Sequence, residues 1–237
     1  MKKNAIKIDG IPALLWGGEA GRLFIAVHGN MSSKDDEAVA IFAEEAAAAG
    51  CRTLSFDLPG HGERKGEPRA CSVQNCVADL GVVGAFARGL SPDLGLFGCS
   101  MGAYFSLLAL RGLPLARCLF LSPVVDMGRL IDGMMKAAGV SEARLEAEKE
   151  IHTPYGPLYW DYYSYVKAHP VTAWDKPTEI LCASADAVSE PAAVAAFAAR
   201  FGCGLKVLPG GEHYFHTPEQ LSAYRRWLRE KIGDAAQ

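Results

Sequence analysis

The chain has 237 residues, of which 50% are hydrophobic and 22% are charged, and its formal net charge is -3. This length and composition predict one globular domain that spans residues 1–237. The mild negative charge argues against nucleic acid or an anionic membrane surface as the main partner, and no apolar run is long enough to span a bilayer.

Short apolar runs alternate with helical patterns, which predicts an α/β fold with a mostly parallel sheet covered by helices on both faces. Eight strands are expected, at 5–9, 12–16, 22–28, 51–57, 94–98, 117–122, 178–184 and 204–208. The first two strands form a hairpin, which is the predicted antiparallel edge of the sheet. The inner strands, such as 22–28, are apolar throughout, as strands buried on both faces are. One helix is predicted to begin at Ser33, and another follows the capping box Thr217-Pro218-Glu219-Gln220.

Residues 124–176, called the cap segment below, break the alternation because they are much longer than an ordinary crossover between strands. An insertion of this length is typically a lid or cap over a functional site. On a helix, Tyr159 and Tyr163 share one face and Trp160 flanks it. We predict that these three aromatic residues bind substrate; the alternative is that they only anchor the cap segment to the core.

The motif Gly98-Cys99-Ser100-Met101-Gly102 follows an apolar strand and precedes a buried helix. A serine on such a tight turn needs neighbours without bulk, because side chains at 98 and 102 would collide with adjacent elements. The turn presents its hydroxyl at the helix N-terminus, where amides favour developing negative charge. We therefore predict that Ser100 is a nucleophile rather than an ordinary serine in a glycine-rich turn.

Two backbone amides are candidates to bind the oxyanion of a tetrahedral intermediate. Strand 22–28 ends in His28-Gly29-Asn30, and the following loop can offer the N–H of Asn30 opposite the N–H of Met101. Two converging donors are what such an oxyanion requires. A structural role for His28, bonded to the loop backbone, fits better than a catalytic one.

The general base and its acid partner are expected on loops that follow late strands. His213 comes after the last strand and before the last helix, where the alternative is a surface histidine. Asp186 follows strand 178–184 and would orient the imidazole of His213 and stabilise its charged form. Asp126 and Glu190 remain as residues that replace or assist Asp186.

Taken together, the sequence resembles the α/β-hydrolase superfamily, specifically its branch of small carboxylesterases, monoacylglycerol lipases and serine aminopeptidases. The motifs that carry the resemblance are His28-Gly29-Asn30, Asp57-Leu58-Pro59-Gly60-His61-Gly62, Gly98-Cys99-Ser100-Met101-Gly102, Ser184-Ala185-Asp186 and Gly211-Glu212-His213. The resemblance implies the α/β-hydrolase fold, a triad of Ser100, Asp186 and His213, and a structural role for the loop 57–62. Glu212 and Ser184 depart from the pattern, which often has glycine at both positions.

These features predict a serine hydrolase that cleaves a carboxylic ester, with a short-chain or aromatic acyl group, through an acyl-enzyme on Ser100. The expected partner is a small-molecule ester, and the mechanism needs no cofactor. An aminopeptidase, amidase, thioesterase or C–C hydrolase using the same triad is the first alternative. A non-catalytic binding protein with a hydrolase-like pocket is the second.

Cysteine usage and the amino terminus predict a cytoplasmic protein. The seven cysteines are an odd number without a C-x-x-C pair, and several lie in apolar segments, as reduced cysteines do. No ligand quartet has the spacing of a zinc site, so no metal is expected. Residues 1–9 are basic but lack the apolar stretch of a signal peptide.

Overall fold

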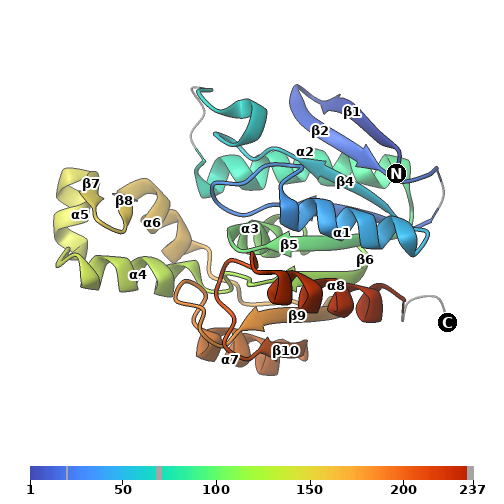
Figure 1. The fold of residues 1–237 in the computed structure, drawn as a ribbon. Helices are drawn as coiled ribbons and strands as arrows, with labels where there is room; N and C mark the ends of the chain where they lie inside the picture. The colour runs from blue at the N-terminus through green and yellow to red at the C-terminus, as the bar shows by residue number, and fades with distance from the viewer. Residues whose placement is uncertain (20, 68–70, 234–237) are drawn as a thin grey trace.

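An eight-stranded sheet forms the centre of the computed structural model, which describes residues 1–19, 21–67 and 71–233 (Figure 1). In spatial order the strands are β1 (Lys3–Ile8), β2 (Ile11–Trp16), β4 (Arg52–Phe56), β3 (Leu23–Val27), β5 (Leu94–Cys99), β6 (Leu115–Leu121), β9 (Thr178–Ala183) and β10 (Gly204–Leu208). β1 and β2 are antiparallel to their neighbours, and the other six strands are mutually parallel. The predicted mostly parallel sheet with an antiparallel edge hairpin is confirmed.

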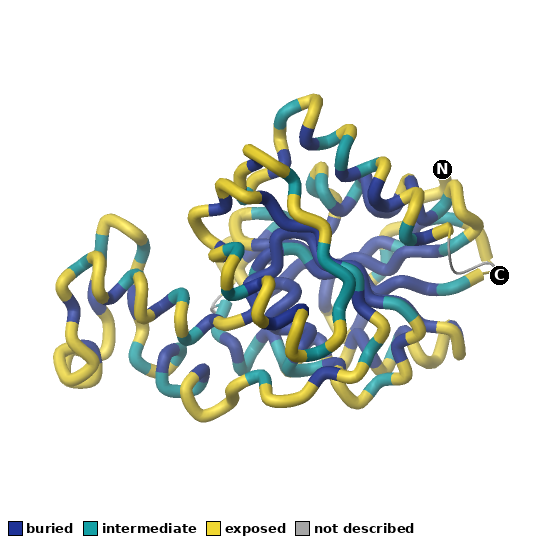
Figure 2. Tube along the Cα trace, turned by 90° about the horizontal axis from the view of Figure 1, so that it is seen from below, coloured by how far each residue is buried: buried dark blue, intermediate teal, exposed yellow. Residues whose placement is uncertain are grey.

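Helices cover both faces of this sheet. α1 (Glu37–Ala48) and α8 (Pro218–Gly233) pack on one face, where Phe42 and Trp227 are buried against apolar side chains of the inner strands. α2 (Val73–Leu90), α3 (Met101–Ala109) and α7 (Pro191–Phe201) pack on the other face. The inner strands are therefore buried between two layers of helices, which explains why most of their residues are apolar (Figure 2).

Two predicted helix starts have different outcomes. The first helix begins at Glu37 rather than Ser33, because the Asp36 side chain accepts the first free amide, that of Glu37. For α8 the predicted capping box is present, since the amide of Gln220 donates to Thr217 Oγ1 at 3.3 Å and the amide of Thr217 donates to Gln220 Oε1 at 3.3 Å.

The cap segment projects beyond the sheet on the side where the parallel strands end (Figure 1). It contains α4 (Met127–Ala137), α5 (Glu142–Glu148), the antiparallel strands β7 (Glu150–Thr153) and β8 (Gly156–Tyr159), and α6 (Trp160–Ala168). The predicted helical face of aromatics is wrong in one respect: α6 begins at Trp160, and Tyr159 ends β8 because the hairpin holds its backbone extended.

Within the described residues, no helix is both long and apolar enough to cross a membrane.

Candidate active site

Ser100 occupies a strained turn between β5 and α3. Its φ is +51°, in the left-handed region that residues with side chains seldom adopt. The turn is held on both sides, because the Ser100 amide donates to the Leu121 carbonyl at 3.0 Å and the Val124 amide donates to the Ser100 carbonyl at 3.0 Å. The strain therefore persists because strand β6 and the chain that follows it fix the turn.

Glycine at position 102 lets α3 approach the end of β3. A Cβ atom there would lie 2.4 Å from the His28 carbonyl oxygen and 2.5 Å from that of Val27, which is closer than any real Cβ contact. At position 98, a Cβ would lie 2.8 Å from the Cα of Ala103. Both glycines are thus required by backbone contacts, as the sequence motif indicates.

Ser100 joins a continuous chain of hydrogen bonds with His213 and Asp186. Ser100 Oγ lies 2.9 Å from His213 Nε2, and His213 Nδ1 lies 2.8 Å from Asp186 Oδ2. With Nδ1–H donating to the carboxylate, the Nε2 lone pair faces the serine hydroxyl and can accept its proton. The structure thus brings together three residues that are far apart in the sequence.

The carboxylate of Asp186 is held by the backbone as well as by histidine. Its Oδ1 accepts the amides of Val188 at 2.8 Å and Ser189 at 2.7 Å, and its side chain is fully buried. These donors stabilise the charged carboxylate and fix its orientation. The second oxygen is left to orient His213.

The two alternative acids lie elsewhere. The Asp126 side chain accepts the amide of Arg129 at 2.9 Å and so caps α4. Glu190 forms an ion pair with the same arginine at 2.6 Å. Both carboxylates are therefore bonded to Arg129 of α4, whereas His213 is bonded to Asp186.

Asn30 and Met101 belong to two segments that meet at Ser100. Asn30 lines the same pocket as Ser100, and its neighbour Gly29 is so close that an added Cβ would lie 3.1 Å from the Ser100 Cβ. Met101 is the first residue of α3, so its amide is one of the free donors of a helix N-terminus. The Ser100 amide already donates to the Leu121 carbonyl, so the amides of Asn30 and Met101 stay the predicted donors to the oxyanion.

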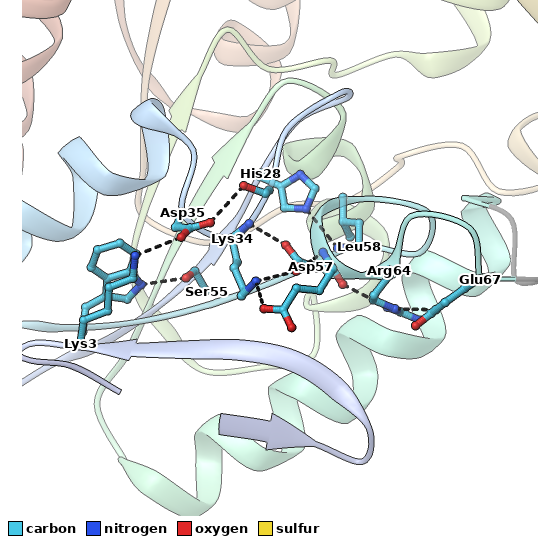
Figure 3. Close-up of polar contacts among 12 residues, drawn as sticks. Lys3, His28, Lys34, Asp35, Ser55, Asp57, Leu58, Arg64 and Glu67 are labelled. Atoms are coloured by element: carbon cyan, nitrogen blue, oxygen red, sulfur yellow. Dashed lines mark hydrogen bonds and ion pairs between the residues drawn. The ribbon is translucent and has the colours of Figure 1, made fainter. Parts of the chain in front are cut away.

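His28 is a structural residue of the loop after β3. Its Nδ1 lies 2.7 Å from the Gly29 carbonyl, and its Nε2 accepts the Leu58 amide at 3.0 Å (Figure 3). Burial lowers the pKa of His28 to about 4, so the ring is neutral at neutral pH. Only a neutral ring can donate from Nδ1 to the Gly29 carbonyl and accept the Leu58 amide at Nε2.

The loop 57–62 is held by a buried carboxylate, that of Asp57. Its Oδ1 accepts the Lys34 amide at 2.8 Å, and its Oδ2 lies 2.8 Å from Lys34 Nζ (Figure 3). Arg64 donates to the Asp57 carbonyl at 3.0 Å and pairs with Asp79 at 2.6 Å. These bonds fix the loop against the segment that leads into α1, and they support the structural role that the resemblance implies.

Ser100 and His213 open into a pocket of about 540 Å³, a size typical of small-molecule sites. Its walls come from the loops after β3, β9 and β10, from the turn after β5, from the end of β6 and from the first turn of α1, and no described residue of the cap segment is among them. Six further residues line the pocket that were not predicted as site residues: Met31, Val39, Leu121, Val188, Tyr214 and Phe215. For all of these except Val39, which lies in α1, the position at or after the end of a strand was the available signal, because parallel sheets bind ligands at that edge.

Tyr159, Trp160 and Tyr163 are not among the described residues that line this pocket, and their role in substrate binding stays a prediction. Tyr163 is buried inside the cap segment, where its hydroxyl donates to Asp132 Oδ1 at 2.6 Å. Trp160 packs beside it, with Lys149 Nζ 5.7 Å from the ring centroid. These two rings therefore contact Asp132 of α4 and Lys149, which follows α5.

The cap segment instead borders an adjoining groove of about 430 Å³ between α4 and the loop after β9. Leu130, Met134 and Tyr155 line it from the cap segment. Ala187 and Val188 line both this groove and the Ser100 pocket, so the two are neighbours. In the part of the chain that the structure describes, no cluster of three or more His, Cys, Asp or Glu side chains is placed to hold a metal ion.

Solved structures similar to this one extend over nearly the whole chain. Est1E from Butyrivibrio proteoclasticus, solved with ferulic acid bound, has a TM-score of 0.77 at 23% identity, covering 97% of this chain and 99% of that one. A putative hydrolase from Agrobacterium vitis S4 has a TM-score of 0.78 at 19% identity, covering 98% of each chain. Alpha/beta hydrolase domain-containing protein 10 from mouse has a TM-score of 0.79 at 15% identity, covering 100% of each chain. At these identities the likeness shows the fold alone.

A comparison with curated protein sequences found no significant match. A family model described as the alpha/beta hydrolase family matches residues 24–226, a range that includes Ser100, Asp186 and His213. Since this match covers most of the sequence, the chain belongs to the alpha/beta hydrolase family.

Proposed function

We propose that the protein is a serine hydrolase that cleaves a carboxylic ester through an acyl-enzyme on Ser100. The observation that carries this proposal is the chain of hydrogen bonds from Ser100 through His213 to Asp186. Its geometry is that of a nucleophile, a general base and an orienting acid. The strained backbone of Ser100 also supports it, because such strain is concentrated at functional sites.

In the proposed reaction, Ser100 Oγ attacks the ester carbonyl while His213 Nε2 takes its proton. The amides of Asn30 and Met101 bind the resulting oxyanion, and each such donor typically lowers the barrier by about 3 kcal/mol. His213 then protonates the leaving alcohol. Water cleaves the acyl-enzyme by the same route, and no cofactor is needed.

The proposed substrate is a small ester with an aromatic or short acyl group. Val39, Leu121 and Phe215 give the pocket apolar walls. Met31 and Tyr214, which are 82% and 58% exposed, add apolar surface at the pocket. Exposed apolar side chains gathered at one site favour an apolar ligand. Est1E, a structural neighbour, was solved with ferulic acid, an aromatic acid, which agrees with this choice.

A fluorophosphonate probe tests the nucleophile directly. We expect it to label the wild type and Ser164→Ala, a control in α6 away from the pocket, and to leave Ser100→Ala unlabelled. Ser100→Ala should also lose ester hydrolysis by several orders of magnitude without a change in melting temperature. Ester turnover by Ser100→Ala within about tenfold of the wild type would remove the proposal.

A panel of p-nitrophenyl esters, aminoacyl anilides and acyl thioesters tests the bond that is cleaved. The proposal predicts that kcat/KM is highest for the esters and that phenyl-bearing acyl groups are accepted. Faster cleavage of anilides or thioesters would assign the triad to an aminopeptidase, amidase or thioesterase. Binding of esters without labelling or turnover would indicate a binding protein instead.

A further inference from the structure

A pair of cysteine thiols lies beside the proposed oxyanion loop and takes no part in the proposed reaction. Cys71 Sγ and Cys76 Sγ are 3.5 Å apart, and each of the seven cysteines is a free thiol in the structure. Cys71 is partly exposed just before α2, whereas Cys76 is fully buried in the first turn of that helix. One thiol is therefore accessible to a reagent, and the other is held next to it.

His61 connects this thiol pair to Asn30. Its Nδ1 lies 3.0 Å from the Pro59 carbonyl oxygen, and its Nε2 lies 3.3 Å from Asn30 Oδ1. Both ring nitrogens thus face oxygen acceptors, and only the doubly protonated ring can donate to both. A hydrogen bond with Cys71 raises the pKa of His61, against the effect of burial.

Cys71 is the thiol of the pair that ionises. The hydrogen bond from Cys76, together with His61 and Arg64, lowers the pKa of Cys71 to about 6. The same hydrogen bond, followed by burial, raises the pKa of Cys76. The arrangement favours a Cys71 thiolate beside a His61 imidazolium, with Cys76 as a neutral thiol that donates to the thiolate.

Other ionisable groups face this cluster. Asp57 favours the charged form of His61, and the His28 ring lies 5.3 Å from the His61 ring. Asp79 of α2 and Tyr162 of α6 interact electrostatically with the thiols. Because Tyr162 comes from the cap segment, the thiol pair lies where that segment, α2 and the loop 57–62 meet.

We propose that Cys71 and Cys76 form a reversible disulfide under a peroxide oxidant, and that this bond, acting through His61, shifts Asn30 and slows turnover at Ser100. The existence of the disulfide is independent of the proposed function. Its effect on turnover rests on that function.

The chemistry takes two electrons from the two thiols. The Cys71 thiolate attacks hydrogen peroxide, its sulfur gains an oxygen to give the sulfenic acid, and hydroxide leaves. The Cys76 sulfur then attacks the Cys71 sulfur. The S–O bond breaks, and the Cys76 proton leaves with the oxygen as water. A dithiol reductant returns both thiols.

Disulfide formation removes the negative charge that supports the His61 imidazolium. The pKa of His61 then falls, and the neutral ring has a single donor for its two acceptors, the Pro59 carbonyl and Asn30 Oδ1. When the single proton is on Nδ1, Nε2 no longer donates to Asn30 Oδ1, and Asn30 loses its fixed position. Displacing one of two oxyanion donors should lower kcat about tenfold, less than the loss that removing a donor causes.

Peptide mass analysis after peroxide treatment tests the bond itself. In the wild type, the peptide that contains both cysteines should lose the mass of two hydrogen atoms, and a dithiol should reverse this change. Cys76→Ser should stop at the Cys71 sulfenic acid, which a dimedone reagent traps. Cys203→Ser, which removes a partly buried thiol in another part of the fold, is the matched control and should form the bond as the wild type does. A Cys71–Cys76 peptide that keeps both hydrogens while other cysteines oxidise would overturn the proposal.

Ester hydrolysis before and after peroxide tests the link to Asn30. We expect kcat to fall about tenfold in the wild type and Cys203→Ser and to recover with the dithiol. In Cys71→Ser, which lacks the thiolate, kcat should already be lowered before treatment and should not respond to peroxide. Iodoacetamide should alkylate Cys71 with a pH midpoint near 6 in the wild type and a higher midpoint in His61→Gln. A disulfide that forms without a change in kcat would refute the link to Asn30. A protein that hydrolyses no ester but still forms the bond would refute the proposed function alone.

Discussion

The two carboxylate oxygens of Asp186 have separate tasks, since one accepts backbone amides and the other accepts His213 Nδ1–H. Asp186→Asn keeps an oxygen for the amides but can present an NH2 group to Nδ1, which favours the wrong tautomer of the imidazole. We expect kcat to fall by about four orders of magnitude with little change in melting temperature. Steady-state kinetics and thermal unfolding measure the two effects.

Asp126→Asn is the control, because asparagine still caps α4 and the carboxylate bonded to His213 is that of Asp186. Its kcat should equal that of the wild type. The assignment of the acid would fail if Asp126→Asn lost more activity than Asp186→Asn.

His28 should make the stability of the protein depend on pH. Its pKa is about 4 in the folded chain and 6.5 as its ordinary value, so between these values the unfolded chain binds the extra proton. His28 therefore adds on the order of 3 kcal/mol to the free energy of unfolding above pH 6.5, and this contribution is lost as the pH falls to about 4.

Denaturant unfolding of the wild type and His28→Gln, measured from about pH 7 to about pH 4.5, isolates this term, because groups common to both proteins cancel. Glutamine retains an acceptor for the Leu58 amide but does not titrate. The difference in the free energy of unfolding between the two proteins should narrow as the pH falls. A constant difference would show that His28 does not carry the effect.

At the scale of elements, the contact between α3 and the end of β3 depends on the absence of a side chain at 102. Gly102→Ala would press a Cβ against the carbonyl oxygens of Val27, the last residue of β3, and of His28, which follows it. We expect a loss of about 3 kcal/mol in the free energy of unfolding, and loss of activity through the displaced turn.

Gly81→Ala in α2 is the matched control. A Cβ at this helical position has no atom within 4 Å, so alanine should stabilise the helix by about 1 kcal/mol. Chemical denaturation of both variants gives the comparison, and equal effects would remove the steric explanation.

The aromatic cluster of α6 is expected to stabilise the cap segment rather than to select substrates. Tyr163→Ala removes a buried ring and its bond to Asp132, which should cost about 3 kcal/mol in the free energy of unfolding. The ratio of kcat/KM values for phenyl and acetyl esters should stay within about twofold of the wild type, since Tyr163 lies outside the Ser100 pocket. A selective loss of phenyl esters would return Tyr163 to the substrate site.

Elements and site residues differed in how far the sequence could predict them. The sequence singles out Ser100, Asp186 and His213 as candidates because each follows a strand, and the ends of parallel strands meet at one edge. The partners of Tyr163 were not found, because periodicity shows that a helix face is apolar but not which element covers it. The hairpin ending at Tyr159 was missed because β7 and β8 have only four residues each.

On the scale of the whole molecule, α8 closes the face of the sheet opposite α3. Trp227 is fully buried there beside Tyr224, and Glu45 of α1 pairs with Arg225 and Arg229 of α8. Trp227→Ala should lower the free energy of unfolding by about 4 kcal/mol, because a large buried side chain leaves a cavity. At a temperature where the variant is still folded, kcat should match that of the wild type. Calorimetry and kinetics check the two halves of this expectation.

The position of the cap segment divides the proposed triad within the sequence. Ser100 precedes it, whereas Asp186 and His213 follow it, and the halves of the sheet meet where β6 pairs with β9. The tip of the cap hairpin carries Tyr155, which is 58% exposed and accessible to a protease that cuts after aromatic residues. One cut there would leave two polypeptides, neither of which holds a complete proton relay. Ester hydrolysis by the nicked protein would then report, without any label, that the two polypeptides remain assembled along β6 and β9.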